Sequence, residues 1–216
     1  MKIEGRTFVV TGGASGLGRA TVDMIIKNGG NAAILDLNEG QGNKAASELG
    51  SSVRFFQCDV TETESITKAV EGTVAWVKQS GRPLGGIIPA AGVGNPATIL
   101  DRHGAPFSLD HFDFVMNINV RGTIDTVRQF LAHLAKVDPS SPTTSAASSP
   151  TAPPRLPMEA AMSEKTRAQL LKATEYPPRQ GQPTEFAQIV QQAIENVMLN
   201  GTVLRLDGAL RLPSKF

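Results

Sequence analysis

Short hydrophobic runs alternate with longer amphipathic segments through the first two thirds of the chain. The short runs, rich in β-branched and other apolar residues, predict buried strands at 6–11, 32–35, 53–58 and 85–91. The longer segments carry apolar residues at helical spacing and predict helices at 17–28, 39–49, 61–81 and 109–136. Strand–helix alternation of this kind predicts a mainly parallel, doubly wound α/β sheet, with ligands at the carboxyl ends of its strands.

Two of these helices carry further signals. Thr61 and Glu64 have the spacing of a capping box, which predicts that the third helix begins at this point. The long fourth helix has one apolar face, formed by Phe112, Val115, Met116, Asn119, Thr123, Phe130 and Leu134.

The composition changes abruptly after the long helix. Residues 139–154 read PSSPTTSAASSPTAPP and contain only Pro, Ser, Thr and Ala. A segment without charged or large apolar residues can bury little surface to offset the entropy of ordering it, so we expect a disordered tether over 137–157. Further elements are predicted after it, namely helices at 163–173 and 184–199 and a last strand at 202–206.

Composition and charge narrow the function classes. The 216 residues are 40% hydrophobic and carry a net charge of +1 without a Lys/Arg block, which favours a small-molecule partner over nucleic acid or a membrane. The single cysteine, Cys58, excludes an intrachain disulfide, and no metal site is expected. No apolar run reaches membrane-spanning length and no targeting peptide is evident, so we expect a cytoplasmic protein, with the mitochondrion as the alternative.

The turn after the first strand has a pattern that suits a dinucleotide. In TGGASGLG, Gly12 permits the tight turn, Gly16 lets the backbone approach a pyrophosphate, and Gly18 lets the helix pack closely on the strand. Asp36 ends the second strand, where a carboxylate can bind the adenosine ribose hydroxyls and repel a 2′-phosphate. No Lys or Arg lies in the glycine loop before Gly18 or within a few residues after Asp36, so the pattern favours NAD over NADP.

Four motifs together resemble the short-chain dehydrogenase/reductase family: TGGASGLG at 11–18, CDV at 58–60, AAG at 90–92 and NVRG at 119–122. The resemblance implies that Asp59 contacts the adenine, that Ala91 and Gly92 back the cofactor, and that Asn119 belongs to the catalytic tetrad. With the glycine turn, the expected NAD-binding residues are Gly12, Ser15, Gly16, Leu17, Gly18, Asp36, Asp59, Val60, Ala91 and Gly92.

Longer segments are most similar to the type 2 3-hydroxyacyl-CoA dehydrogenases, a group also called type 10 17β-hydroxysteroid dehydrogenases. The similarity includes IEGRTFVVTGGASGLGRAT, NVRGTIDTVR and GQPTEFAQIV, and spans about residues 3–136 and 155–213. It implies an acyl-CoA or another secondary alcohol or ketone as substrate. The resemblance also implies a homo-oligomer, because the long helix of this family packs against itself in a dimer.

The chain departs from the family pattern in two places. Pro89 stands where the family has Asn before its AG, and it removes a backbone donor. The family also follows its long helix with a strand bearing the catalytic Ser, a Tyr-x-x-x-Lys helix and a sixth strand, and none of these is recognisable here. The only tyrosine, Tyr176, has Gln180 four residues on and two prolines between, so we interpret it as a loop aromatic. Asn119 would then be the only tetrad member left.

The interpretation is therefore an incomplete Rossmann-like domain. Residues 1–136 form the NAD-binding portion, and residues 158–216 add C-terminal helices and the last strand of the same domain. The last strand either pairs with the fourth strand, closing a gap of roughly 14 Å, or remains an ill-fitting tail. Three hypotheses follow: a dehydrogenase with little or no activity, a catalytically dead NAD-binding protein, and the product of a message that lacks the active-site exon.

Overall fold

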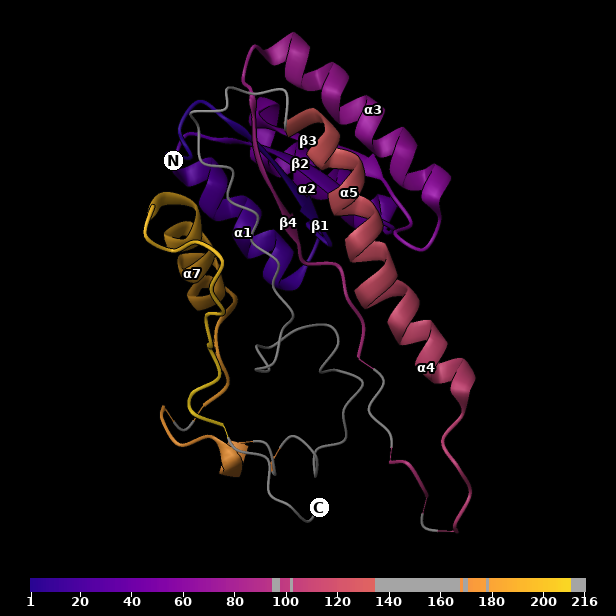
Figure 1. The fold of residues 1–216 in the computed structure, drawn as a ribbon. Helices are drawn as coiled ribbons and strands as arrows, with labels where there is room; N and C mark the ends of the chain where they lie inside the picture. Colours follow the sequence, from indigo (N-terminus) through magenta and orange to yellow (C-terminus); the bar gives the residue numbers. More distant parts are fainter. Residues whose placement is uncertain (95–97, 102, 135–167, 169–170, 178, 211–216) are drawn as a thin grey trace.

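The computed structural model describes residues 1–94, 98–101, 103–134, 168, 171–177 and 179–210. Figure 1 shows a twisted sheet with helices on both faces and one long helical rod that extends away from it. The N-terminus lies beside the sheet, and helix α7 (Pro183–Glu195), from the other end of the sequence, lies close to it. The arrangement is a layered α/β fold, as the sequence pattern predicts.

The sheet has four parallel strands: β1 (Thr7–Thr11), β2 (Asn31–Asp36), β3 (Val53–Gln57) and β4 (Leu84–Pro89). Their order is β3-β2-β1-β4 in the described part of the chain. Strand β1 is buried along its whole length, which is why it consists of Val, Phe and Thr without alternation. The incomplete, Rossmann-like parallel sheet predicted from the sequence is confirmed.

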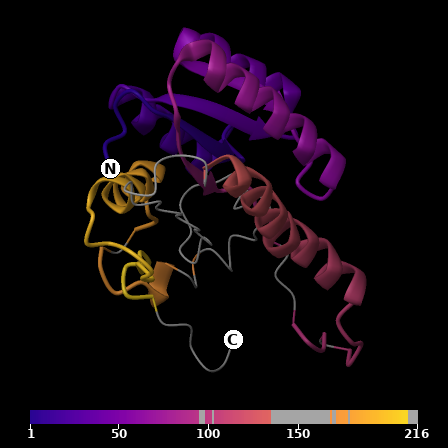
Figure 2. The same ribbon diagram turned by 45° about the horizontal axis from the view of Figure 1, so that its top comes forward.

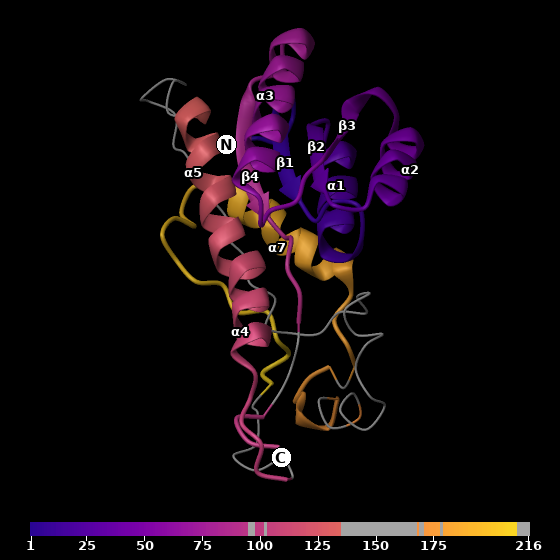
Figure 3. The ribbon, with the colours of Figure 1, turned by 90° about the vertical axis from the view of Figure 1, so that its right-hand side faces the viewer.

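Helices cover both faces of this sheet (Figure 3). Helices α1 (Gly16–Lys27), α2 (Glu39–Leu49) and α7 (Pro183–Glu195) share one hydrophobic core with the strands. Helices α3 (Thr63–Ser80) and α5 (Thr123–Leu134) build the core on the other face, where Trp76 and Phe130 are buried. Helix α7 packs against α1.

The long fourth helix consists of three joined segments. Helix α4 (Leu109–Met116) leads into a π-helical segment, η2 (Asn117–Gly122), which continues as α5. The sequence predicted the helix but not the π-helical segment. The apolar face of the whole long helix is covered only at its α5 end. Helix α4 projects beyond the sheet (Figures 1 and 2), and its residues Phe112 and Met116 are exposed.

The predicted capping box at the start of the third helix is wrong. Helix α3 begins at Thr63, and its N-cap residue, Glu62, makes no capping hydrogen bond with its side chain. The Thr61 hydroxyl donates instead to Asp59 Oδ1 at 2.7 Å. The amide and the hydroxyl of Thr61 both donate to Asp59, and these bonds hold Thr61 in the loop before the helix, so the pattern marks the helix start two residues too early.

The predicted last strand at 202–206 is also wrong. These residues are exposed and form no strand, and Val203 is 93% exposed. Strand β4 pairs with β1 alone among the described strands, so the last strand does not close the sheet and the alternative of an ill-fitting tail holds. A β-pattern makes a strand only where a neighbouring edge is within reach. The expected tether at 137–157 and most of the helix at 163–173 lie outside the described residues.

Candidate functional site

The carboxyl ends of β1 and β4 are joined by one side chain. Thr11, the last residue of β1, accepts hydrogen bonds through Oγ1 from the amides of Ala90 at 3.1 Å and Ala91 at 3.0 Å. Gly12 follows with φ of +63°, and a Cβ on it would lie 2.9 Å from Ala90 O and from Ala91 N. The turn after β4 is therefore seated directly on the glycine loop.

The glycine loop leaves the N-terminus of α1 open toward this end of the sheet. A Cβ on Gly18 would lie 2.1 Å from Gly12 O, so only glycine allows α1 to start this close to the loop. Ser15, the N-cap residue, makes no side-chain capping bond, and the first turn of α1 contains no acidic residue. The amides of Gly16, Leu17 and Gly18 and the positive helix dipole therefore suit an anion such as a pyrophosphate.

Asp36 at the end of β2 binds both the glycine loop and the residue before α2. Its Oδ2 accepts from the Ala14 amide at 3.1 Å, and its Oδ1 accepts from the Asn38 amide at 3.0 Å. Each carboxylate oxygen has a second lone pair, so Asp36 can still accept from two hydroxyl groups of a ligand. The carboxylate is fixed beside the glycine loop before any ligand binds.

The loop after β3 is folded around Asp59. Its Oδ1 accepts from the Thr61 amide at 2.9 Å as well as from the Thr61 hydroxyl, and its own amide donates to Ser65 Oγ at 2.9 Å. The next residue, Val60, packs on the long helix, because a Cβ on Gly122 would lie 2.7 Å from Val60 O. Both residues thus lie in a loop that several hydrogen bonds and close packing hold.

Cys58 starts the same loop as a buried core residue. Burial raises the pKa of its thiol to about 11, an effect that the negative charges of Asp59 and Asp36 reinforce against a hydrogen bond with Ser65. The thiol is therefore neutral near pH 7, and a nucleophilic role does not fit its surroundings.

Asn119 is tied to the turn after β4. Its Oδ1 accepts from the Val93 amide at 2.9 Å, and its Nδ2 donates to Val93 O at 2.9 Å. Gly92 is close as well, since a Cβ on it would lie 3.2 Å from Asn119 Oδ1. The side chain from the π-helical segment thus serves the backbone of the turn rather than pointing freely toward a ligand.

The structure brings the expected cofactor-binding residues together. Tyr176, interpreted from the sequence as a loop aromatic, is not among them. The glycine loop, Asp36, the loop at Asp59 and the turn at Ala91 and Gly92 all follow the carboxyl ends of neighbouring parallel strands. Tyr176 lies in a bend, is 80% exposed and donates its amide to Gly208 O at 3.3 Å. The serines at 140–149 lie outside the described residues.

A polar network beside the loop after β3 was not predicted. It joins Arg121 and Asp125 of the long helix to Thr61 and Thr63, the latter being the first residue of α3. The available sequence signal was spacing, because Asp125 lies one helical turn before both Arg128 and Gln129, where helical side chains meet.

No group of three His, Cys, Asp or Glu side chains in the described residues could hold a metal ion. None of the helices described is long and apolar enough to cross a membrane.

Comparison with known proteins gives consistent matches. A family model described as short chain dehydrogenase matches residues 6–141. The 3-hydroxyacyl-CoA dehydrogenase type-2 of Drosophila melanogaster is 30% identical over an alignment that covers 97% of this chain and 99% of that protein. The crystal structure of 3-hydroxyacyl-CoA dehydrogenase type-2 from Mycobacterium avium superposes with a TM-score of 0.84 at 25% identity, covering 98% of each chain.

A further solved structure shares the fold. It is a 3-ketoacyl-(acyl-carrier-protein) reductase from Brucella melitensis complexed with NADH, with a TM-score of 0.75 at 19% identity. The match covers 96% of this chain and 98% of that one.

Proposed function

Because this chain belongs to the short-chain dehydrogenase family, we propose that it binds NAD at the carboxyl ends of β1 to β4 and has little or no dehydrogenase activity of its own. The observation that carries the binding proposal is the glycine loop, in which Gly12 and Gly18 fit only without a side chain and the start of α1 is uncapped. The pyrophosphate would lie on the amides of Gly16, Leu17 and Gly18, with Ser15 beside them.

The other expected residues would hold the two ends of the dinucleotide. Asp36 would accept hydrogen bonds from the adenosine ribose hydroxyls, and its negative charge would disfavour a 2′-phosphate, which favours NAD over NADP. Asp59 and Val60 would border the adenine. Ala91 and Gly92 would lie along the nicotinamide half, held by Thr11 and by Asn119.

The proposal of weak activity comes from the residues that would move a proton. When bound, the nicotinamide supplies or accepts a hydride at the substrate carbon. The matching proton needs a positioned acid, whose loss typically costs about 10²- to 10⁴-fold in rate. The chain has one tyrosine, which is exposed in a bend, and the four positions after it include two prolines. The alignment with the Drosophila protein is 256 residues long, so that relative has residues with no counterpart in this 216-residue chain.

The substrate class follows from the named relatives. Matched proteins from several organisms carry the name 3-hydroxyacyl-CoA dehydrogenase type-2, so a 3-hydroxyacyl-CoA or a related secondary alcohol or ketone is the proposed substrate. We also assign residues 158–216 to the same domain as 1–136, which the packing of α7 on α1 supports. The proposed compartment is the cytoplasm, with the mitochondrion as the alternative.

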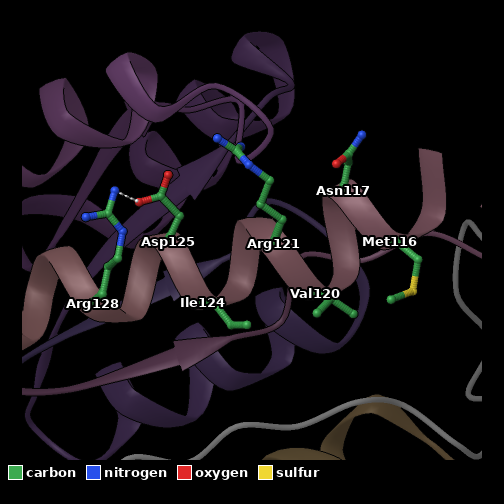
Figure 4. A pocket seen from close by; sticks show the side chains of 7 residues that line it. All are labelled: Met116, Asn117, Val120, Arg121, Ile124, Asp125 and Arg128. Carbon is green, nitrogen blue, oxygen red and sulfur yellow. Dashed lines mark ion pairs between the residues drawn. The ribbon is translucent and has the colours of Figure 1, made fainter. Parts of the chain in front are cut away.

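A second copy of this chain is the proposed macromolecular partner. Met116, Val120 and Ile124 recur every four residues along the long helix and point to one side of it (Figure 4). Ile124 is 60% exposed and Val120 is 41% exposed. An exposed apolar stripe of this kind suits pairing with an identical helix.

Calorimetry and kinetics separate the proposal from its alternatives. NAD should bind to the purified chain, whereas oxidation of NADH with acetoacetyl-CoA should stay at the rate of a control without protein. Turnover at a normal dehydrogenase rate would refute the proposed inactivity, and absence of NAD binding would refute the proposed site. Sequencing the transcript across 136–158 tests the remaining alternative, because a longer message encoding Tyr-x-x-x-Lys would show that the working protein is a different chain.

A further inference from the structure

A buried carboxylate anchors the long helix to the start of α3. Asp125 is 5% exposed, and its Oδ2 accepts from Thr63 Oγ1 at 2.7 Å. Its Oδ1 accepts from Gln129 Nε2 at 3.0 Å and forms an ion pair with Arg128 at 2.7 Å. Burial alone would raise the pKa of Asp125, but the hydrogen bonds from Gln129 and Thr63 and the charge of Arg128 lower it below its ordinary value. The carboxylate is therefore charged and fixed near neutral pH.

Arg121 extends this anchor into the loop after β3. Its Nη2 donates to Thr63 Oγ1 at 3.1 Å, and its Nη1 donates to Thr61 O at 2.8 Å. Thr61 in turn donates its amide and its hydroxyl to Asp59 Oδ1. A continuous chain of hydrogen bonds therefore runs from Asp125 to Asp59 through Thr63, Arg121 and Thr61.

The direction of the side chains agrees with this connection. Figure 4 shows Asn117, Arg121 and Asp125 on one side of the long helix, opposite the apolar stripe of Met116, Val120 and Ile124. The Arg121 guanidinium hydrogen-bonds to both Thr61 and Thr63. Since Thr63 starts α3 and Thr61 lies in the loop, Arg121 fixes the loop relative to both helices.

We propose that Arg121 and Asp125 are positioning residues for the adenine half of the dinucleotide, acting through Thr61 on the carboxylate of Asp59. The inference rests on the proposed NAD site and adds to it the determinant of its adenine end. Neither residue needs to touch the ligand. Without the guanidinium, Thr61 and Asp59 keep their mutual hydrogen bonds but lose their attachment to the long helix. The loop is then less ordered in the free protein, and adenine binding becomes weaker because it must supply the free energy of ordering the loop.

Arg54 provides a control of the same charge outside this network. Its Nη1 donates to Gln79 Oε1 at 3.3 Å, and the residue is exposed. It lies near the start of β3, whereas the loop at 59–63 follows the end of that strand. Replacing Arg54 therefore changes the net charge by the same amount and leaves both Asp125 and the connection to Thr61 in place.

The test compares Arg121→Met, Arg121→Lys and Arg54→Met with the natural chain. Calorimetry with NAD and with ADP-ribose, which shares the adenine half, should show affinities about 5- to 10-fold weaker for Arg121→Met and unchanged for Arg54→Met. Arg121→Lys should be intermediate, because its ammonium can still donate to Thr61 O. Hydrogen exchange should accelerate at the amide of Thr61 in Arg121→Met and stay unchanged at the amide of Ala14.

The outcomes separate this inference from the proposed function. No binding of NAD or ADP-ribose by the natural chain would overturn the proposed site itself. Natural binding together with equal affinities for Arg121→Met and Arg54→Met would overturn the positioning role alone. Urea unfolding of each variant identifies loss of the whole fold. Should Arg121→Met fail to fold, Arg121→Lys decides, and natural affinity with natural exchange at Thr61 would overturn the inference.

Discussion

Asn119 and Val93 form a reciprocal pair of hydrogen bonds, in which one side-chain amide satisfies both the N–H and the C=O of the same residue at 2.9 Å each. The two residues are far apart in the chain, and the pair fastens the turn after β4 to the π-helical segment. One N–H and one oxygen lone pair of the Asn119 amide are used to hold the turn. The sequence could not separate this role from a catalytic one.

Replacing Asn119 should cost stability as well as binding. Asn119→Ala leaves the backbone N–H and C=O of Val93 without these partners, and we expect a loss of about 1 to 3 kcal/mol in the free energy of unfolding. Asn119→Asp should cost as much, since a carboxylate can accept from the N–H but repels the C=O. Urea unfolding measures both variants, and an unchanged midpoint for either would contradict the paired arrangement.

Gly12 and Gly5 offer a matched comparison, because both have positive φ but only Gly12 is crowded. A Cβ on Gly12 would lie 2.9 Å from Ala90 O, whereas a Cβ on Gly5 would have nothing within 4 Å. Gly5→Ala should therefore cost only about 1 to 2 kcal/mol of backbone strain. Gly12→Ala should cost about 1 to 3 kcal/mol more and abolish measurable NAD binding. Thermal unfolding and calorimetry test this, and equal costs for the two variants would count against the close seating of the turn.

Asp36 should control both affinity and cofactor choice. Asp36→Asn removes the negative charge and puts an amide nitrogen where an oxygen accepts from Ala14 or Asn38. We expect NAD to bind about tenfold more weakly and the preference for NAD over NADP to shrink, because a 2′-phosphate is no longer repelled. Calorimetry with both dinucleotides gives the ratio. Asp110→Asn, an equal charge change at the exposed start of α4, should leave the ratio unaltered.

The N-terminal end of α7 should become less stable in acid. The hydrogen bond from Arg179, together with the amide of Gln182, lowers the pKa of Glu185 to about 2. An unfolded glutamate has a pKa of about 4.3, so the unfolded chain takes up this proton first as the pH falls. The contribution of the ionised Glu185 to the free energy of unfolding is therefore complete above about pH 5 and is lost as the pH falls toward 2.

Urea unfolding of the natural chain and Glu185→Gln from pH 7 to pH 2 tests this dependence. The difference in stability between the two should be constant at neutral pH and should disappear in acid, and salt should reduce it because the pair is exposed. Glu175→Gln provides a variant of equal charge without the capping position. A difference that grows as the pH falls would refute the assignment.

The apolar stripe should decide the oligomeric state. Ile124→Glu places a charge in the middle of the face formed with Met116 and Val120, and it should convert a dimer into a monomer. Light scattering or sedimentation measures the mass. Val197→Glu, at a residue that is 69% exposed elsewhere, should leave the dimer intact. Equal masses for Ile124→Glu and the natural chain would show that the pairing surface lies elsewhere.

Local sequence signals predicted the strands and most helices to within a few residues. Strands β1, β2 and β4 are buried along nearly their whole length, so each consists mainly of apolar residues and needs no long-range information to recognise. Strand β3 lies at the edge of the described sheet and exposes Arg54 and Gln57, but its Val and Phe residues still mark it as a strand. The glycine loop could also be predicted, since tight turns and close helix packing require glycine at fixed spacing. These features indicate the candidate site from the sequence alone.

Features that depend on distant partners were not predicted. The hydrogen bond between Thr63 and Asp125 joins residues far apart in sequence. Thr61 donates its hydroxyl to Asp59 and lies in the loop, where the sequence pattern had placed the start of the helix. The segment 202–206 has the pattern of a strand but no neighbour in the described sheet. In each case the outcome depends on what the fold brings near, which local patterns do not contain.

The packing of α7 on α1 has a consequence for biosynthesis. Ala187, Val190 and Ile194 of α7 belong to the same core as Val22 and Ile25 of α1, at opposite ends of the chain. During translation at about 5 to 20 residues per second, α1 leaves the ribosome on the order of ten seconds before α7 can cover it. The nascent chain therefore carries an exposed apolar helix face for most of its synthesis, so a chaperone that shields such surfaces would act before the last helix emerges.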